Sequence, residues 1–339
     1  MKGYFILIAI LSLYMVLFPL AAVSASNAKQ SNNETASSSS NEEITTTAKQ
    51  NDVTNKERDE IENTIKVMRT SSGKVIDLEI YDYLIGSVAS EMPVTYEKEA
   101  IKAQVVACYT YAKWIKANAD SSALDGADIS DSPSNHQGYL DENELKDKWG
   151  EKYDDYIAKI KNCVNEVMGE YMTYDNEPIM AVYHAISPGK TESAKVAWGK
   201  DIPYLQSVVA SGDKLSPDFD STVTLTEEKF KSAAIKLEGV KLGSKPESWV
   251  KDCKKSKNGF VQSVNIGSES FDGHDIRSAF SLRSPFFTIT HKNGKFTFKV
   301  VGYGHGIGMS QYSADYMARQ GSTYKEILLH FYTGVKLVK

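Results

Sequence analysis

The sequence predicts an α+β fold, because its helical and strand-like patterns are segregated along the chain. Apolar residues recur at helical spacing through residues 81–168, whereas short strand-like runs and hairpin turns come after residue 178. The first half should therefore be rich in helices and the second half rich in strands. An uncharged apolar stretch, Tyr4 to Val23, precedes both halves and predicts an N-terminal transmembrane helix.

The apolar stretch has 20 residues, which at about 1.5 Å rise per residue cross a hydrocarbon core of about 30 Å. A cleaved signal peptide is the alternative, since Val23-Ser24-Ala25 has the small residues of a processing site. The stretch is longer than the roughly 7–15 apolar residues of a usual signal peptide, which favours an uncleaved membrane anchor over residues 1–23. Both interpretations export the rest of the chain.

Residues 24–65 are expected to form a flexible tether. Of the 31 residues from Ser24 to Thr54, 17 are Ser, Thr or Asn, and none is aromatic. Such a stretch buries too little apolar surface to offset the entropy lost on ordering. Residues 66–339 then form the globular part.

The charge balance argues against nucleic-acid binding. The chain carries 39 Lys or Arg against 44 Asp or Glu, a net charge of −5, with no basic block anywhere that would face phosphates, so a polyanion is not the expected partner. The three cysteines, Cys108, Cys163 and Cys253, are widely spaced and include no C-x-x-C pair. They suggest neither a disulfide framework nor a cysteine-based zinc cluster.

Helices are predicted first along the chain. Their apolar stripes have three- and four-residue spacing, and Pro93 and Gly169 mark two of the helix ends. The predicted helices cover residues 81–92, 97–116 and 145–168, with two more at 310–319 and 324–331. Strands are predicted at residues 179–186 and in a hairpin, 286–290 and 296–301, around Asn293-Gly294.

Glu91 is the most informative single residue. On a helical wheel it falls at the edge of the apolar sector formed by Leu84, Val88 and Met92. It also lies in the last turn, where the helix dipole disfavours a negative charge. Both effects raise the pKa of a carboxyl towards the range in which it can give and later accept a proton. The alternative is a side chain that turns to solvent or pairs with a lysine.

Four glycines on alternate positions, Gly302 to Gly308, precede a predicted helix. They satisfy neither G-x-G-x-x-G nor G-x-x-x-x-G-K-[ST], so nucleotide binding is not expected. The glycines would let backbone amides approach a ligand closely, and His305 and Gln311 add polar side chains that can contact hydroxyl or amide groups. A tight connection packed for structural reasons is the alternative.

Other polar candidates carry less information. The turn Ser187 to Ser193 ends a predicted strand and is typical of a ligand-binding loop or of an ordinary solvent-facing turn. His184 is typical of a structural histidine. Cys108 lies in an apolar helical stripe, where a free cysteine is usually inert, which argues against a thiol hydrolase. His136 stands alone near two aspartates and gives weak evidence for a metal.

Several blocks of sequence together resemble one protein family. They are SEMP at Ser90 to Pro93 followed by EAIKAQVVACYTYA, then SPGKTESAKVAWGKDIPYLQSV, IRSAFSLRSPFF, GYGHGIGMSQYSADYMA and HFYTGV. In this order, from about Tyr81 to Val335, they resemble the stage II sporulation protein D family, also called amidase enhancers. The blocks GHGIGMSQY and GKTE are long enough to make the resemblance specific.

The resemblance implies an enzyme. Members of the family are membrane-anchored lytic transglycosylases that cut MurNAc-GlcNAc β-1,4 bonds of peptidoglycan during forespore engulfment and leave 1,6-anhydroMurNAc ends. The family's catalytic glutamate matches Glu91, which would be the single acid and base. A catalytic domain over residues 66–339 would place its two halves around one substrate cleft. The motif blocks and polar loops suggest these substrate-binding residues: Ser187, Lys190, Thr191, Glu192, Tyr204, Gly304, His305, Gly306 and Gln311.

The resemblance also implies partners and a location. The expected partners are peptidoglycan strands, the amidase stage II sporulation protein P and stage II sporulation protein M, with no nucleic acid. The catalytic domain would be extracytoplasmic, on a single-pass anchor in the mother-cell engulfing membrane, facing the septal peptidoglycan. No cofactor is expected. Some members carry a Cys and His metal site where this chain has ISDSPSNHQ, and because His136 is the only strong ligand left there, no structural zinc is predicted.

A function of a different class stays open beside this one. The chain would then be a non-catalytic peptidoglycan-binding scaffold that enhances a cell-wall amidase. Replacement of Glu91 by Gln separates the two, since a scaffold would keep its effect on the amidase and an enzyme would lose its cleavage.

Overall fold

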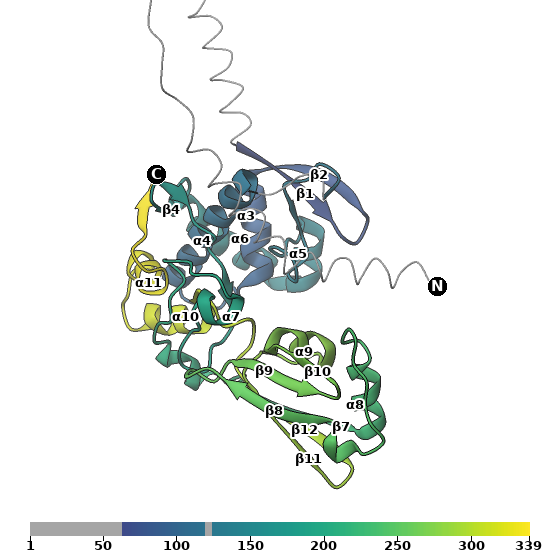
Figure 1. The fold of residues 1–339 in the computed structure, drawn as a ribbon. Helices are drawn as coiled ribbons and strands as arrows, with labels where there is room; N and C mark the ends of the chain where they lie inside the picture. Colours follow the sequence, from purple (N-terminus) through teal and green to yellow (C-terminus); the bar gives the residue numbers. More distant parts are fainter. Residues whose placement is uncertain (1–62, 119–123) are drawn as a thin grey trace, which may run out of the picture. The chain divides into compact units, whose positions relative to one another are not determined.

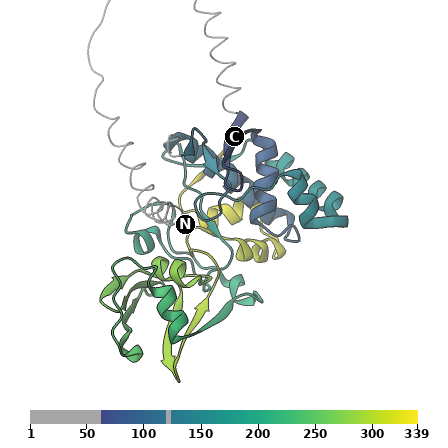
Figure 2. The ribbon, with the colours of Figure 1, turned by 90° about the vertical axis from the view of Figure 1, so that its right-hand side faces the viewer.

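The computed structural model describes residues 63–118 and 124–339, which divide into two compact units. The first unit comprises residues up to Glu91 together with residues 112–161, and the second comprises residues 92–111 and 162–339. Figures 1 and 2 show the ribbon from two sides. Helices make up most of residues 80–167, whereas the second half contains both strands and helices, so the predicted segregation is only partial.

The first unit combines a small sheet with helices. Strands β1 (Thr64–Arg69) and β2 (Lys74–Glu79) form an antiparallel hairpin, and β3 (Ile129–Ser130) pairs in parallel with β1. Helix α3 (Ile80–Glu91) follows β2 directly and buries an apolar face that includes Tyr83, Leu84 and Val88. Strand β1 begins at Thr64 and so includes the last two residues of the expected tether.

The prediction of one continuous helix over residues 145–168 is wrong, because the helix is interrupted. The structure has α5 (Glu142–Trp149), a 3-10 turn η2 (Gly150–Lys152) and α6 (Tyr153–Val167). Gly150 ends α5 with a φ of 52°, a left-handed backbone value that glycine adopts easily and that interrupts a helix. Helices α3 and α4 (Lys98–Asn118) match their predicted ranges within two residues.

The second unit contains two small sheets outside its main strand-rich part. Strand β4 (Tyr171–Tyr174) pairs with β5 (Glu177–Pro178) and β14 (Lys336–Val338), and β6 (Tyr183–His184) pairs in parallel with β13 (Met309–Ser310). The strand predicted over residues 179–186 is therefore reduced to β6. The backbone N–H of Val182 bonds to the carbonyl of Met180, a local turn that takes this segment out of a continuous ladder.

Residues 220–301 form the strand-rich part of the second unit, in the green to yellow-green portion of Figures 1 and 2. One sheet has the order β11-β12-β7, from β7 (Asp220–Thr226), β11 (Phe287–Lys292) and β12 (Lys295–Val301). The other has the order β10-β9-β8, from β8 (Val250–Lys255), β9 (Val261–Ile266) and β10 (Glu269–Phe271). The hairpin predicted around Asn293-Gly294 is confirmed as β11 and β12.

Both sheets contribute to one apolar core with helices α8 (Glu227–Ala234) and α9 (Gly273–Phe280). Phe230 stacks on Phe296 with ring centroids 3.9 Å apart and packs against Phe280 at 4.7 Å. Aromatic contacts of this kind add to the hydrophobic free energy of burial. This core therefore makes residues 220–301 a packed body within the second unit.

The two helices predicted near the C-terminus are confirmed as α10 (Gln311–Arg319) and α11 (Tyr324–Phe331). The remaining elements of the second unit are helix α7 (Ala194–Trp198) and the short 3-10 turns η3 (Ser211–Leu215) and η4 (Pro246–Ser248).

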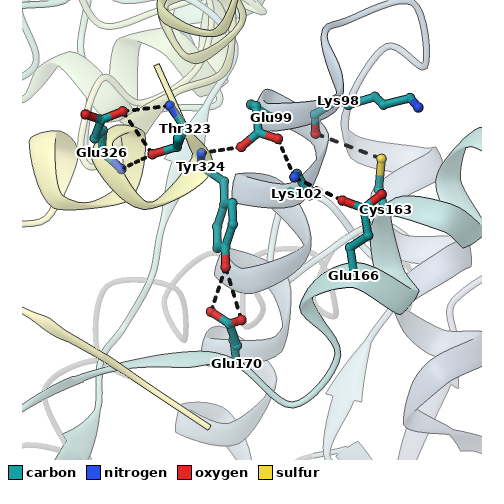
Figure 3. Close-up of polar contacts among 9 residues, drawn as sticks. All are labelled: Lys98, Glu99, Lys102, Cys163, Glu166, Glu170, Thr323, Tyr324 and Glu326. Carbon is teal, nitrogen blue, oxygen red and sulfur yellow. Dashed lines mark hydrogen bonds and ion pairs between the residues drawn. The ribbon is translucent and has the colours of Figure 1, made fainter. Parts of the chain in front are cut away.

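A polar cluster holds α11 in place (Figure 3). Tyr324 donates its hydroxyl to Glu170 at 2.9 Å and its N–H to Glu99 at 2.8 Å. Lys102 bonds to Glu166 at 3.0 Å and pairs with Glu99, so the carboxylates of the cluster are matched by donors.

Within residues 63–118 and 124–339, every helix is too short or too polar to cross a bilayer. The predicted anchor, Tyr4 to Val23, and most of the predicted tether lie outside the described residues.

Candidate functional site

Glu91 is the last residue of α3, and its carboxyl is held by the loop that precedes α5. The backbone N–H of Gly138 donates to Glu91 Oε1. On α5, Lys148 donates from Nζ to the carbonyl of Ala89 at 2.9 Å, two residues before Glu91. The carboxyl therefore lies beside a backbone donor and an ammonium group, both from the segment 138–148.

Opposing effects act on the proton affinity of Glu91. Burial is the largest and raises the pKa of the carboxyl, because desolvation disfavours its charged form. The hydrogen bond from Gly138 and the charge of Lys148 act in the other direction, and the net pKa is raised. Glu91 is half-buried and its carboxyl accepts a hydrogen bond from the chain, which does not fit the alternative in which the side chain simply turns to solvent.

Gly138 is a site residue that the sequence analysis missed. A Cβ at this position would lie 3.0 Å from Glu91 Oε1 and in closer contact with Ser90 Oγ. Only a glycine lets the backbone come near enough for its N–H to reach the carboxyl. The sequence gives no sign of the contact between Gly138 and Glu91, since the segment HQGY is typical of an ordinary loop.

The loop around Gly138 is fastened on both sides. Tyr83 of α3 donates to Gln137 Oε1 at 2.7 Å, and the rings of Tyr83 and Tyr139 stack with centroids 6.1 Å apart. Arg69 of β1 pairs with Asp131 at 3.1 Å and with Glu144 at 2.7 Å, and Glu144 also completes the capping box of α5. Helix α5 and Lys148 are thereby fixed relative to α3.

His136 forms its polar contact within its own segment of the chain. Its Nδ1 lies 2.8 Å from Ser130 Oγ, and burial lowers the pKa of His136 to about 4, so the imidazole is neutral at pH 7. Of the aspartates nearby in sequence, Asp128 accepts from the Lys66 N–H and Asp131 pairs with Arg69. In the part of the chain that the structure describes, no group of three His, Cys, Asp or Glu side chains is arranged to hold a metal.

In the second unit, the structure brings the two long motif blocks together. Ile186 forms a bridge with Tyr303, and Glu192 forms one with Ile307. The Glu192 N–H donates to the carbonyl of Gly306 at 2.7 Å. The turn Ser187 to Ser193 and the glycine segment are thus neighbours, as a shared site requires.

The four alternate glycines let their backbone approach other atoms closely, but these atoms belong to the chain itself and not to a ligand. Gly302, Gly304, Gly306 and Gly308 all have φ between 70° and 104°. A Cβ would lie 2.6 Å from the Ile186 carbonyl oxygen at Gly302 and 2.7 Å from His184 Cβ at Gly304. The structural alternative therefore accounts for these glycines, because the backbone they free packs on the segment 182–187 and on Phe286.

Five of the predicted substrate-binding residues are buried: Ser187, Thr191, Glu192, Gly306 and Gln311. The Glu192 carboxylate is 2% exposed and accepts from Ser256 Oγ at 2.6 Å, from Asn258 Nδ2 at 3.1 Å and from the Ser193 N–H at 3.0 Å. Thr191 Oγ1 accepts from the Val208 N–H, and Gln311 donates to Gln104 at 3.2 Å. These side chains fix the loops to their surroundings.

The other four predicted residues retain accessible surface: Lys190, Tyr204, Gly304 and His305. His305 accepts the Ile307 N–H on Nδ1, and its ring lies 6.1 Å from that of Trp198. Although His305 is only half-buried as a whole, desolvation of its ring holds its pKa well below the usual range, and the nearby His184 acts in the same direction. The imidazole of His305 is therefore a neutral hydrogen-bonding group. The Tyr204 hydroxyl accepts the Met180 N–H at 3.1 Å.

Asp213 was also missed by the sequence analysis. Its carboxylate accepts from the Ser187 N–H and from Ser310 Oγ, each at 2.7 Å, and burial raises its pKa. It therefore links the start of one motif block to the end of the other. Glu91 belongs to the first unit, whereas Asp213 and the nine predicted substrate-binding residues belong to the second.

Comparison with known proteins gives consistent matches. The family model described as Stage II sporulation protein matches residues 68–174. Stage II sporulation protein D of Bacillus amyloliquefaciens is 37% identical over 275 residues, which cover 81% of this chain and 78% of the relative. The protein of the same name from Bacillus subtilis is 34% identical over 276 residues, with the same coverage. The amidase enhancer of Bacillus subtilis is 25% identical over 309 residues, covering 75% of this chain and 40% of that protein.

Proposed function

Because the chain belongs to the stage II sporulation protein D family, we propose that it is a lytic transglycosylase that cleaves the glycan strands of peptidoglycan. The observation that carries this proposal is the environment of Glu91. Its carboxyl has a raised pKa, and one of its oxygens is held by the Gly138 N–H. A carboxyl of this kind suits a reaction that needs one proton donor and later one proton acceptor.

In the proposed reaction, Glu91 transfers its proton to the oxygen of the β-1,4 bond while the bond from that oxygen to the anomeric carbon of MurNAc breaks. The 6-hydroxyl of the same MurNAc attacks the anomeric carbon and gives its proton to the Glu91 carboxylate. One strand ends in a free 4-hydroxyl, the other ends in 1,6-anhydroMurNAc, and no water is consumed. One carboxyl suffices, whereas ordinary glycosidases use two.

The neighbours of Glu91 support both halves of this cycle. Burial favours the protonated carboxyl that the first step needs, and Gly138 and Lys148 favour the carboxylate that the second step needs.

In the second unit we assign saccharide contacts to the accessible residues Lys190, Tyr204 and His305 and to the backbone at Gly304. The buried residues, such as Thr191 and Glu192, are positioning residues in this proposal, because their polar atoms already bond within the chain. The setting proposed with this activity is forespore engulfment, with a membrane anchor and with stage II sporulation proteins P and M as partners.

A non-catalytic role is the second candidate. The observation that favours it is the amidase enhancer among the relatives, because its name describes stimulation of another enzyme. In that case the chain would bind peptidoglycan and raise the activity of an amidase without cutting the glycan itself.

The replacement Glu91→Gln tests the proposal. The full-length chain is incubated with purified peptidoglycan, with and without its stem peptides, and the products are analysed by mass spectrometry. We expect 1,6-anhydroMurNAc ends from the unmodified protein and a loss of at least about 10²-fold in the variant, since a general acid and base contributes about 10²–10⁴ in rate.

The same two proteins are then added to a cell-wall amidase. If neither releases anhydro ends and both stimulate the amidase equally, the transglycosylase proposal is wrong and the second candidate holds. Cys108→Ser serves as a control. Cys108 is buried against Gln104 at 3.3 Å, and we expect its replacement to leave the products unchanged.

A further inference from the structure

The strand-rich part of the second unit differs in charge from the rest of the chain. Residues 220–301 hold 14 Lys or Arg against nine Asp or Glu, although the whole chain has a net charge of −5. The chain-wide balance conceals this local excess of positive charge. When charges of one sign are concentrated on one part of a protein, they produce a local electrostatic potential that attracts groups of the opposite charge.

Four lysines of this excess lie close together on β8 and the turn that follows. Lys251, Lys254, Lys255 and Lys257, here called the basic strip, are all exposed. Strand β8 is an edge of the sheet β10-β9-β8, and register shifts between Lys251 and Lys255 interrupt its pairing with β9. Lysines and bulges on an edge strand also prevent that strand from pairing with a strand of another molecule. This purely structural role is the alternative explanation for the position of the four lysines.

The basic strip keeps an excess of positive charge, because its segment 251–257 holds four lysines and one acid. The one acid within it, Asp252, already accepts a hydrogen bond from Asn265 at 3.1 Å. None of the ion pairs formed within residues 63–118 and 124–339 includes any of the four lysines. Their charge is therefore available to an external anion.

The strip also leads to the loop that carries Lys190 and Thr191. Ser256 and Asn258, which alternate with Lys255 and Lys257, both donate to Glu192, and Asn258 also donates to Ser207 at 2.9 Å. The turn is thereby fixed against the candidate substrate loop. A polymer lying on the strip would continue towards that loop without a change of unit.

We propose that the basic strip binds the carboxylate groups of peptidoglycan and so helps to hold the strand on the second unit. This inference rests on the proposed function for its choice of polymer, because peptidoglycan carries a carboxylate at each muramic acid or on its stem peptide. A single exposed pair contributes at most about 1 kcal/mol, but repeated charges along one polymer let several pairs act together.

The test uses full-length protein in the Glu91→Gln background, so that binding is measured without cleavage. Four lysines of the strip are replaced by glutamine, and a control variant carries Lys231→Gln, Lys236→Gln, Lys292→Gln and Lys295→Gln, which are also exposed and lie in the same part of the unit. Binding is measured by co-sedimentation with peptidoglycan from which phosphate-containing polymers have been removed. We expect about a tenfold weaker affinity for the strip variant at low salt and less than about a twofold change for the control.

Two further arms identify the ligand. Amidation of the peptidoglycan carboxyls should remove the difference between the strip variant and the parent, and 0.5 M salt should reduce it. Equal binding by the strip and control variants, or a difference that survives amidation, would overturn the inference. A difference seen only with walls that retain phosphate polymers would also overturn it, because phosphate and not carboxylate would then be the ligand.

The outcome is separable from that of the proposed function. Loss of strip-dependent binding with normal release of anhydro ends by the parent removes only this inference. Strip-dependent binding without any anhydro ends removes the transglycosylase proposal and leaves the basic strip as a binding surface.

Discussion

Glu91 owes its proposed chemistry to neighbours that oppose one another. The last turn of α3 and burial favour the neutral carboxyl, whereas the Gly138 N–H and the Lys148 ammonium favour the carboxylate. A group balanced in this way can give a proton and take one back within a single reaction cycle. The position of Glu91 on its helix is readable in the sequence, but its partners are not, because they come from 47 and 57 residues further along the chain.

Replacement of Lys148 should change the pH dependence of the reaction. In Lys148→Met the carboxylate loses its nearby positive charge, so the pKa of Glu91 rises further and the alkaline limb of the pH–rate profile moves to higher pH. The profile of anhydro-end release is measured beside that of Lys146→Met, whose lysine lies on the same helix and pairs with Glu142. Identical limbs in the two variants would contradict the role given to Lys148.

Replacement of Gly138 should reduce activity more than stability. In Gly138→Ala the new Cβ would crowd Glu91 Oε1 and Ser90 Oγ, and displacement of a catalytic group by about 1 Å can cost about 10²-fold in rate. Gly243→Ala is the matched control, since a Cβ there has no neighbour within 4 Å. Rates of anhydro-end release and thermal unfolding are compared. A Gly138→Ala protein as active as the control would show that Gly138 does not position the carboxyl.

Among the elements, the turn between β8 and β9 and the loop Ser187 to Ser193 depend on one buried carboxylate. Glu192 accepts hydrogen bonds from Ser256 and Asn258, so two segments about 65 residues apart meet at its oxygens. The sequence marked Glu192 as a polar loop residue and predicted that it contacts substrate. Its burial follows from a long-range contact that no local pattern encodes.

Removal of this carboxylate should destabilise the second unit. Glu192→Ala leaves the donors of Ser256 and Asn258 without their acceptor, and we expect a loss of about 2–4 kcal/mol in the free energy of unfolding. Urea unfolding followed by circular dichroism measures it, with Glu238→Ala at an exposed position as the control. Equal midpoints for the two variants would mean that Glu192 does not fasten these segments.

Prediction of the elements succeeded where the signal is local. Helices α3, α4, α10 and α11 and the hairpin of β11 and β12 follow from apolar spacing, from Pro93 and from Asn293-Gly294. The break between α5 and α6 was missed because a helical stripe continues through Gly150, and the left-handed backbone there is set by the end of α5. Helices α8 and α9 and strands β7 to β10 were also missed, since their apolar residues are few and become a core only when the two sheets and both helices meet.

For the whole molecule, several histidines are held neutral by burial, and this links stability to pH. Burial lowers the pKa of His136 and of His184 to about 4 in the folded chain, against about 6.5 when unfolded. The unfolded state therefore binds more protons between pH 6.5 and pH 4. This contribution to stability is fully present above pH 6.5 and is lost as the pH falls towards 4, at up to about 1.4 kcal/mol per pH unit for each histidine.

We expect the free energy of unfolding to fall between pH 7 and pH 5, and the fall to be shallower by about one proton in His136→Asn. Urea titrations at several pH values measure the slope. His330→Gln, at an exposed histidine, should keep the slope of the parent. A His136→Asn slope equal to that of the parent would contradict the neutral, buried state of His136.

The sequence by itself determined four of the helices, the hairpin around Asn293-Gly294, the placement of Glu91 at the apolar edge of a helix and the family. These depend on residues close together in the chain or on motif blocks that are similar to those of the family. Only the tertiary structure decided which atoms surround Glu91, that the alternate glycines pack against the chain's own backbone, and that the lysines of residues 251–257 are exposed on an edge strand and the turn after it. Those features depend on desolvation, on contacts between segments far apart in the chain and on local concentrations of charge, which arise only when the chain is folded.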